Sequence, residues 1–82
     1  MVIITNDDGT VTVDYDTLSV QVITNIRREC GFFDYSLNWN QYKIKRYKLF
    51  KMYNAVYHAT GKQSFITFNN YESLTFFLLK WS

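Results

Sequence analysis

Residues 12–23, TVDYDTLSVQVI, and residues 67–79, TFNNYESLTFFLL, present the same succession of residue types twice in one chain of 82 residues. Allowing one extra Asn in the second, each has Tyr, an acid, a hydroxyl residue, Leu, another hydroxyl residue and then an apolar run. This composition is typical of a segment in which a strand ends, a capping residue follows and the first apolar turn of a helix begins. Because caps and amphipathic helices use few residue types, convergence explains the likeness slightly better than duplication.

The segment around the first stretch has the pattern of a β-hairpin. Val11, Val13 and Tyr15 alternate with polar residues just after the Asp-Gly pair at residues 8 and 9. Alternation with a period of two beside Asp-Gly is a strong hairpin signal. We therefore expect the chain to begin with two antiparallel strands that turn at residues 6–9.

Each of the two stretches also predicts a helix. The first helix, at about residues 15–30, has Asp14 as its cap and Gly31 just past its end. The second starts after Asn70, with Glu72 in its first turn, where the helix dipole favours an acid. Apolar residues recur at helical spacing in both, namely Tyr15, Leu18, Val22, Ile26 and Cys30 in the first, and Tyr71, Leu74, Phe77, Leu78 and Trp81 in the second.

The middle of the chain, NWNQYKIKRYKLFKMYNAVYHATGKQSFITF at residues 38–68, fits two structures. The absence of Pro and Gly from residue 33 to residue 60 favours a long helix at about 39–60. The density of Tyr, Phe, Val and Ile, and the lack of Glu to pair with the lysines, favours a hairpin turning at residues 60–62. The repeat favours the hairpin, because the first helix also follows one.

These patterns predict a single α+β domain over residues 1–82. We expect an antiparallel sheet with two helices on one face, in the order ββαββα, with residues 38–48 as the joining segment. The alternative is ββααβα, with the helix at about 39–60. The expected core consists of Val11, Val13, Leu18, Val22, Ile26, Val56, Phe65, Leu74 and Leu78.

The composition argues against several classes of function. One Cys and one His cannot supply the four ligands of a usual structural zinc site, and nothing places an orienting group beside Cys30 and His58. The three glycines form no phosphate-binding loop. The segment NDDG at residues 6–9 lacks the spaced oxygen ligands of a calcium-binding loop and is interpreted as a plain turn. We expect no enzyme activity, no cofactor, no metal, no membrane-spanning segment and a cytoplasmic location.

The charge of the chain is strongly uneven. Residues 1–35 carry six acids and two arginines, whereas residues 36–82 carry seven bases and one acid, Glu72. Within the basic half, YKIKRYKLFK at residues 42–51 interleaves bases with aromatic and apolar residues. Such a segment can neutralise phosphates and stack on bases, or fill an apolar pocket on a protein. The predicted partner-binding residues are Trp39, Tyr42, Lys43, Lys45, Arg46, Tyr47, Lys48, Phe50, Lys51 and Tyr53.

Residues 55–78, AVYHATGKQSFITFNNYESLTFFL, resemble the hairpin-then-helix endings of small phage-encoded proteins, including some anti-CRISPR inhibitors. The resemblance implies a non-catalytic inhibitor or adaptor that blocks a host nucleic-acid-handling defence protein or ribonucleoprotein in the host cytoplasm. No site residue can be transferred from it.

A small RNA- or DNA-binding module is the alternative function. We rank it second because Asp7, Asp8, Asp14 and Asp16 would repel phosphates unless they lie on another face. The apolar C-terminal helix also offers a surface for oligomer formation.

Overall fold

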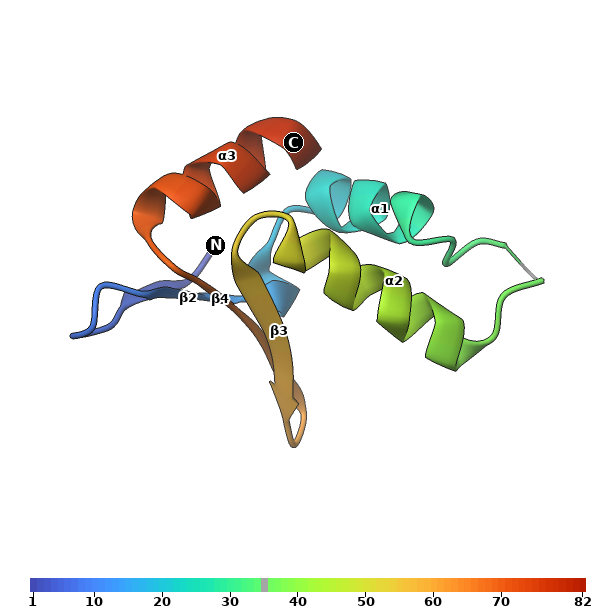
Figure 1. The fold of residues 1–82 in the computed structure, drawn as a ribbon, viewed down its shortest axis with the longest axis horizontal. Helices are drawn as coiled ribbons and strands as arrows, with labels where there is room; N and C mark the ends of the chain where they lie inside the picture. The colour runs from blue at the N-terminus through green and yellow to red at the C-terminus, as the bar shows by residue number, and fades with distance from the viewer. Residues whose placement is uncertain (35) are drawn as a thin grey trace.

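The computed structural model describes residues 1–34 and 36–82. Within them, four strands form one antiparallel sheet in the order β1-β2-β4-β3, accompanied by three α-helices and one short 3-10 helix (Figure 1). The elements in chain order are β1 (Ile3–Thr5), β2 (Val11–Asp14), η1 (Tyr15–Thr17), α1 (Val20–Glu29), α2 (Trp39–Lys51), β3 (Ala55–Thr60), β4 (Gln63–Phe68) and α3 (Tyr71–Trp81). The α+β class and the antiparallel sheet are confirmed.

The expected ββαββα order omits one helix, because α2 occupies most of the predicted joining segment. The alternative order correctly started a helix at Trp39 but extended it to residue 60, whereas α2 ends at Lys51 and β3 begins at Ala55. Between them Asn54 adopts a left-handed backbone with φ 55°. Asn tolerates this conformation better than most residues, so the helix ends without Gly or Pro.

Both predicted hairpins are present. In the first, the Asn6 carbonyl accepts a hydrogen bond from the Gly9 amide at 3.1 Å, and Gly9 has φ 88°. The Asp8 carboxylate accepts hydrogen bonds from the hydroxyl and amide of Thr10, and these bonds lower the pKa of Asp8. This turn satisfies its polar groups locally, as the sequence predicts for residues 6–9.

The two similar stretches give different structures. Asp14 caps only the 3-10 turn η1, and Ser19 starts α1 by accepting from the Val22 amide at 3.2 Å. The predicted helix at 15–30 is therefore two separate elements. In the second stretch, Asn70 accepts from the Ser73 amide at 2.8 Å, and α3 runs on unbroken.

The core lies between one face of the sheet and the helices. The strands contribute Val11, Val13, Ala55, Ile66 and Phe68, all buried. Leu18, Val22, Ile26 and Leu74 are buried as predicted, and Leu78 is half-buried against the same cluster.

Two of the predicted core positions are wrong. Val56 is exposed, and Phe65 is only partly buried, because the pairing of Val56 with Thr67 and of His58 with Phe65 places these residues on the open face. The side chains that point inward from this hairpin are their neighbours in sequence, since successive strand residues alternate between faces.

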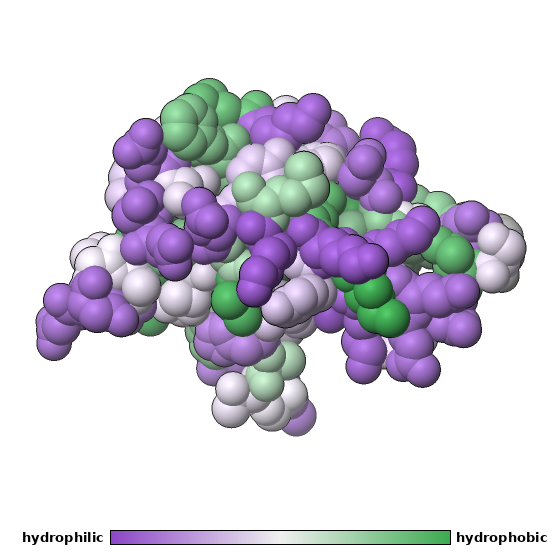
Figure 2. Space-filling view, viewed as in Figure 1, coloured by the Kyte–Doolittle hydropathy of each residue, from purple (hydrophilic) through white to green (hydrophobic). Residues whose placement is uncertain are grey.

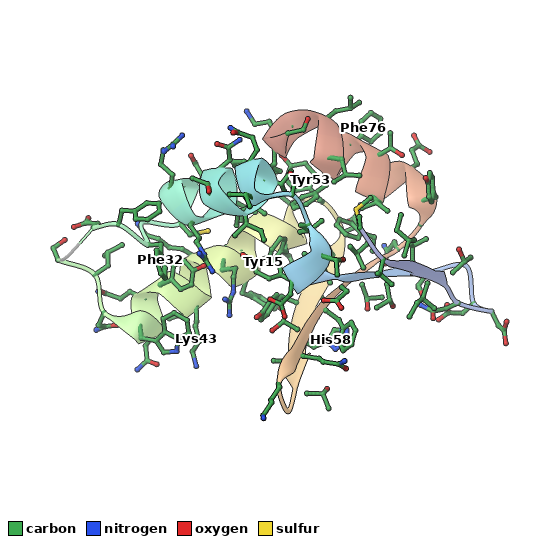
Figure 3. All side chains as sticks on the ribbon, turned by 180° about the vertical axis from the view of Figure 1, so that it is seen from behind. Tyr15, Phe32, Lys43, Tyr53, His58 and Phe76 are labelled. Carbon is green, nitrogen blue, oxygen red and sulfur yellow. The ribbon has the colours of Figure 1, made fainter. Side chains whose placement is uncertain are left out.

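Tyr15 has an unusual position in this core. Its ring makes edge contacts with Phe50 and Tyr57, at centroid distances of 6.5 and 5.4 Å, and its hydroxyl has no hydrogen-bond partner among the described residues (Figure 3). Burial raises the pKa of Tyr15 to about 12. The site therefore favours the neutral phenol over the phenolate.

We expect Tyr15→Phe to increase the free energy of unfolding by about 1 kcal/mol at pH 7, because it removes a buried hydroxyl without a partner. Urea denaturation measures this change, with Tyr47→Phe on the surface as the matched control. Loss of stability in Tyr15→Phe would show that the hydroxyl is satisfied in solution.

The same variant tests the pKa of Tyr15. The unfolded tyrosine ionises near its ordinary pKa of 10, and the folded one only near 12, so the wild type loses stability as pH rises through this interval. Tyr15→Phe lacks this loss. The stability difference between variant and wild type should widen from pH 9 to pH 11, and a constant difference contradicts the raised pKa.

Candidate functional site

The candidate site is built on α2, whose start is set by a capping box. The Asn38 side chain accepts from the Gln41 amide at 2.9 Å, and the Gln41 side chain accepts from the Asn38 amide at 3.0 Å. Lys48 and Lys51 lie in the last turn, where the helix dipole favours positive charge. The basic segment is therefore a well-formed helix, which presents two distinct faces.

One face of α2 belongs to the core. Tyr42, Leu49 and Phe50 are buried, and they follow the helical spacing that aligns residues seven and eight apart. Phe50 and Tyr42, both predicted to contact a partner, are buried in the core, so neither ring is part of the exposed surface of α2. Tyr53, also predicted to contact a partner, is half-buried, with its ring 5.6 Å from that of Phe77.

The other face of α2 is exposed and carries several of the predicted binding residues. Figure 3 shows Lys43 projecting away from the sheet and from the other helices. Lys51 donates a hydrogen bond to the Tyr47 hydroxyl at 3.3 Å. We call this the α2 surface, and its members are Lys43, Ile44, Tyr47, Lys48 and Lys51. Trp39 and Lys45 are also exposed but lie beside the core face, with the Trp39 ring stacked on that of Tyr42.

Sequence reasoning missed several exposed apolar side chains near these lysines. Ile44 lies within the α2 surface and is 54% exposed, and Met52 just beyond the helix is 78% exposed. Phe32 and Phe33, in the turn after α1, are also exposed, and the Phe32 ring lies 5.2 Å from that of Tyr42. Helical spacing could have found Ile44, which is three residues before Tyr47. Figure 2 accordingly shows hydrophobic groups scattered in a mostly hydrophilic face over α2.

Arg46 lies on the core-facing side of α2, four residues from both Tyr42 and Phe50, and is partly buried against aromatic rings of its own chain. Its guanidinium carbon is 3.8 Å from the Tyr57 ring centroid, 5.2 Å from that of Tyr42 and 5.9 Å from that of Trp39. Such contacts are attractive because the ring faces are electron-rich. Arg46 therefore joins α2 to β3, which is a structural role in addition to its predicted place among the partner-binding residues.

The acids of the β1–β2 turn lie apart from the α2 surface. Asp7 and Asp8 occupy the β1–β2 turn, at the opposite end of the molecule from the start of α2 (Figure 1). Asp34 precedes α2, and hydrogen bonds from the side chain and amide of Ser36 lower its pKa, with a smaller contribution from Lys45. Most of the basic surface is thus separated from the acidic hairpin.

Cys30 and His58 lie on different faces of the structure. Cys30 is buried in the core, where desolvation raises the pKa of its thiol and disfavours the reactive thiolate. Tyr57 faces the core, so His58 points to the open face of the sheet, where it hydrogen-bonds Thr67 at 3.0 Å. The two side chains do not form a nucleophile and base pair.

The described residues contain no group of three or more His, Cys, Asp or Glu side chains arranged to hold a metal ion. None of the helices in this part of the chain is both long enough and apolar enough to cross a membrane. Comparison of the chain with family models, curated proteins and solved structures finds no significant match in any of the three.

Arg46→Ala should lower the free energy of unfolding by about 1 kcal/mol, because it removes the cation–π contacts and the packing of the side-chain stem on Tyr57. Lys43→Ala is the matched control, since Lys43 is exposed on the same helix. Thermal and urea denaturation measure both. Equal stability of the two variants would contradict a structural role for Arg46.

Proposed function

We propose that this protein is a non-catalytic inhibitor or adaptor that binds another protein through the α2 surface. The observation that carries this proposal is the mixture of side chains on the outer face of one rigid helix. Ile44 and Tyr47 are each about half exposed, and Lys43, Lys48 and Lys51 lie around them. Exposed aromatic and aliphatic groups beside cations suit a partner with an apolar pocket and an acidic rim.

The aliphatic side chains favour a protein partner over a nucleic acid. Ile44 and Met52 cannot stack on bases as an aromatic ring does, but they gain from burial in an apolar pocket. The lysines would accelerate encounter with an acidic surface, and the aromatic groups would supply most of the binding energy. The partner we propose is a host protein or ribonucleoprotein that handles nucleic acids, as the resemblance to phage-encoded inhibitors implies, met in the host cytoplasm.

The second candidate is an RNA- or DNA-binding module, and one observation favours it. The separation of Asp7 and Asp8 from α2 weakens the repulsion that the sequence suggested. Lys43, Lys48 and Lys51 could then contact phosphates while Tyr47 stacks on a base.

The decisive experiment is an affinity pull-down from a bacterial host lysate, made with and without nuclease. The bait is the wild-type protein, and Tyr47→Ala is the matched control bait. One protein recovered by the wild type in both lysates, and lost with the control bait, supports the protein-binding function. Recovery that vanishes after nuclease treatment supports the nucleic-acid module instead.

Tyr47→Ala should weaken binding to the captured partner by about 2 kcal/mol or more if its ring is a hot spot. The melting temperature should stay within about a degree of wild type, because the ring is half exposed and outside the core. Lys48→Ala should mainly slow association and reduce its salt dependence. Isothermal titration and surface plasmon resonance measure these changes. Unchanged affinity in Tyr47→Ala would remove the α2 surface from the binding site.

Binding to generic single-stranded and double-stranded nucleic acid should be undetectable at low salt if the first proposal is correct. A phosphate-binding surface would instead bind at low salt and weaken steeply as salt rises, because counterions are released on binding. Fluorescence anisotropy over a salt titration distinguishes the two. A steep salt dependence that Lys43→Ala, Lys48→Ala and Lys51→Ala each reduce would establish the nucleic-acid module.

A further inference from the structure

The outer face of α3 is a second exposed surface, on a different helix from the proposed binding site. Leu74, Phe77 and Trp81 of α3 are buried against the core, whereas Tyr71, Phe76 and Leu79 are 61, 57 and 72% exposed. Figure 3 shows Phe76 on the outer side of α3, and Figure 2 shows hydrophobic surface gathered over this helix. A single sheet and two other helices leave this apolar face uncovered.

The charges on α3 are arranged symmetrically about Phe76. The helix has the sequence YESLTFFLLKW, and its only charged residues are Glu72 and Lys80. Both are exposed, and each lies four residues from Phe76, on opposite sides. Residues four apart lie one above another on a helix, so an acid, an exposed ring and a base form one row.

We propose that this α3 face binds a second copy of the same chain, with the two α3 helices antiparallel and a two-fold axis passing by Phe76. In a two-fold contact, residue i meets residue j and residue j meets residue i. Glu72 of each copy then lies against Lys80 of the other, and the two Phe76 rings meet at the centre. A parallel arrangement would instead oppose Glu72 to Glu72.

The charge row identifies a second copy as the occupant, because the face is complementary to itself. An apolar groove of about 630 Å³ borders the same helix and extends the surface available to the partner copy. Its lining includes the uncharged side chains of Leu18, Val22, Thr75, Leu78 and Leu79, together with the terminal residues Met1 and Ser82. The proposal is independent of the function proposed for the α2 surface.

The test is a charge exchange between two single variants. Wild-type protein should show a reversible monomer–dimer equilibrium in sedimentation experiments from about 1 μM to 1 mM. Glu72→Lys and Lys80→Glu should each weaken self-association by about tenfold or more, because each places like charges opposite one another. Mixed together, the two variants should associate with each other, since every facing pair is again Lys with Glu.

Cysteine cross-linking tests the antiparallel orientation separately. Glu72→Cys mixed with Lys80→Cys should form a disulfide between copies, whereas Glu72→Cys alone should not. Equivalent positions would lie eight residues apart along the paired helices, about 12 Å at 1.5 Å per residue. This is too far for a disulfide. Circular dichroism and melting temperature verify that each variant is folded.

Three outcomes would overturn the proposal. They are a wild type that stays monomeric up to 1 mM, a mixture of the two charge variants that associates no better than either alone, and a disulfide that forms with Glu72→Cys alone. Weaker association in Phe76→Ala would support the position of the two-fold axis, and an unchanged dissociation constant would contradict it.

Discussion

The packing of the Phe50 ring holds the separate parts of this chain in one core. Phe50 is fully buried, and its ring centroid lies 6.5 Å from Tyr15 of η1, 6.0 Å from Tyr57 of β3 and 5.7 Å from Phe77 of α3. Phe77 in turn lies 5.3 Å from Phe68 of β4. Aromatic rings bury much apolar area and interact best in such edge and offset geometries. In a chain of 82 residues, one small core must connect many elements, and this cluster links η1, α2, β3, β4 and α3.

The inward direction of Phe50 also determines what α2 presents to solvent. A helix can turn only one stripe of its surface toward the core, and Tyr42, Leu49 and Phe50 occupy that stripe. Lys43, Ile44 and Tyr47 are therefore turned outward, whereas Arg46 lies on the core-facing side between Tyr42 and Phe50, where it meets Tyr57. The basic and aromatic segment that seemed uniform in sequence is divided by its helix into a core half and a surface half. The proposed binding surface is thus a consequence of how the core is packed.

Features with local causes could be predicted from the sequence, and features with tertiary causes could not. The turn at residues 6–9 and the cap Asn70 follow from the hydrogen bonds of a few neighbouring residues. The change from helix to strand at Asn54 has no such signal, because one residue in a left-handed conformation replaces the expected Gly or Pro. The capping box of Asn38 and Gln41 marks the start of α2 and agrees with the alternative order, whereas the strand-like composition further along favours the order without this helix. The pairing of β3 with β4 determines which residues of β3 face the core. The sequence alone does not give this pairing, so the prediction that Val56 is in the core is wrong.

The two similar stretches show how tertiary packing turns related sequences into different surfaces. In the first, the 3-10 turn directs Tyr15 into the core before Ser19 starts a new helix. In the second, α3 begins at Tyr71 itself, so Tyr71, Thr75 and Leu79 lie one turn apart along the side that faces away from the core. The apolar run of α3 is wider than the stripe that the sheet and α1 can cover. Because a small domain has no further layer with which to cover it, this excess apolar surface remains available to another molecule.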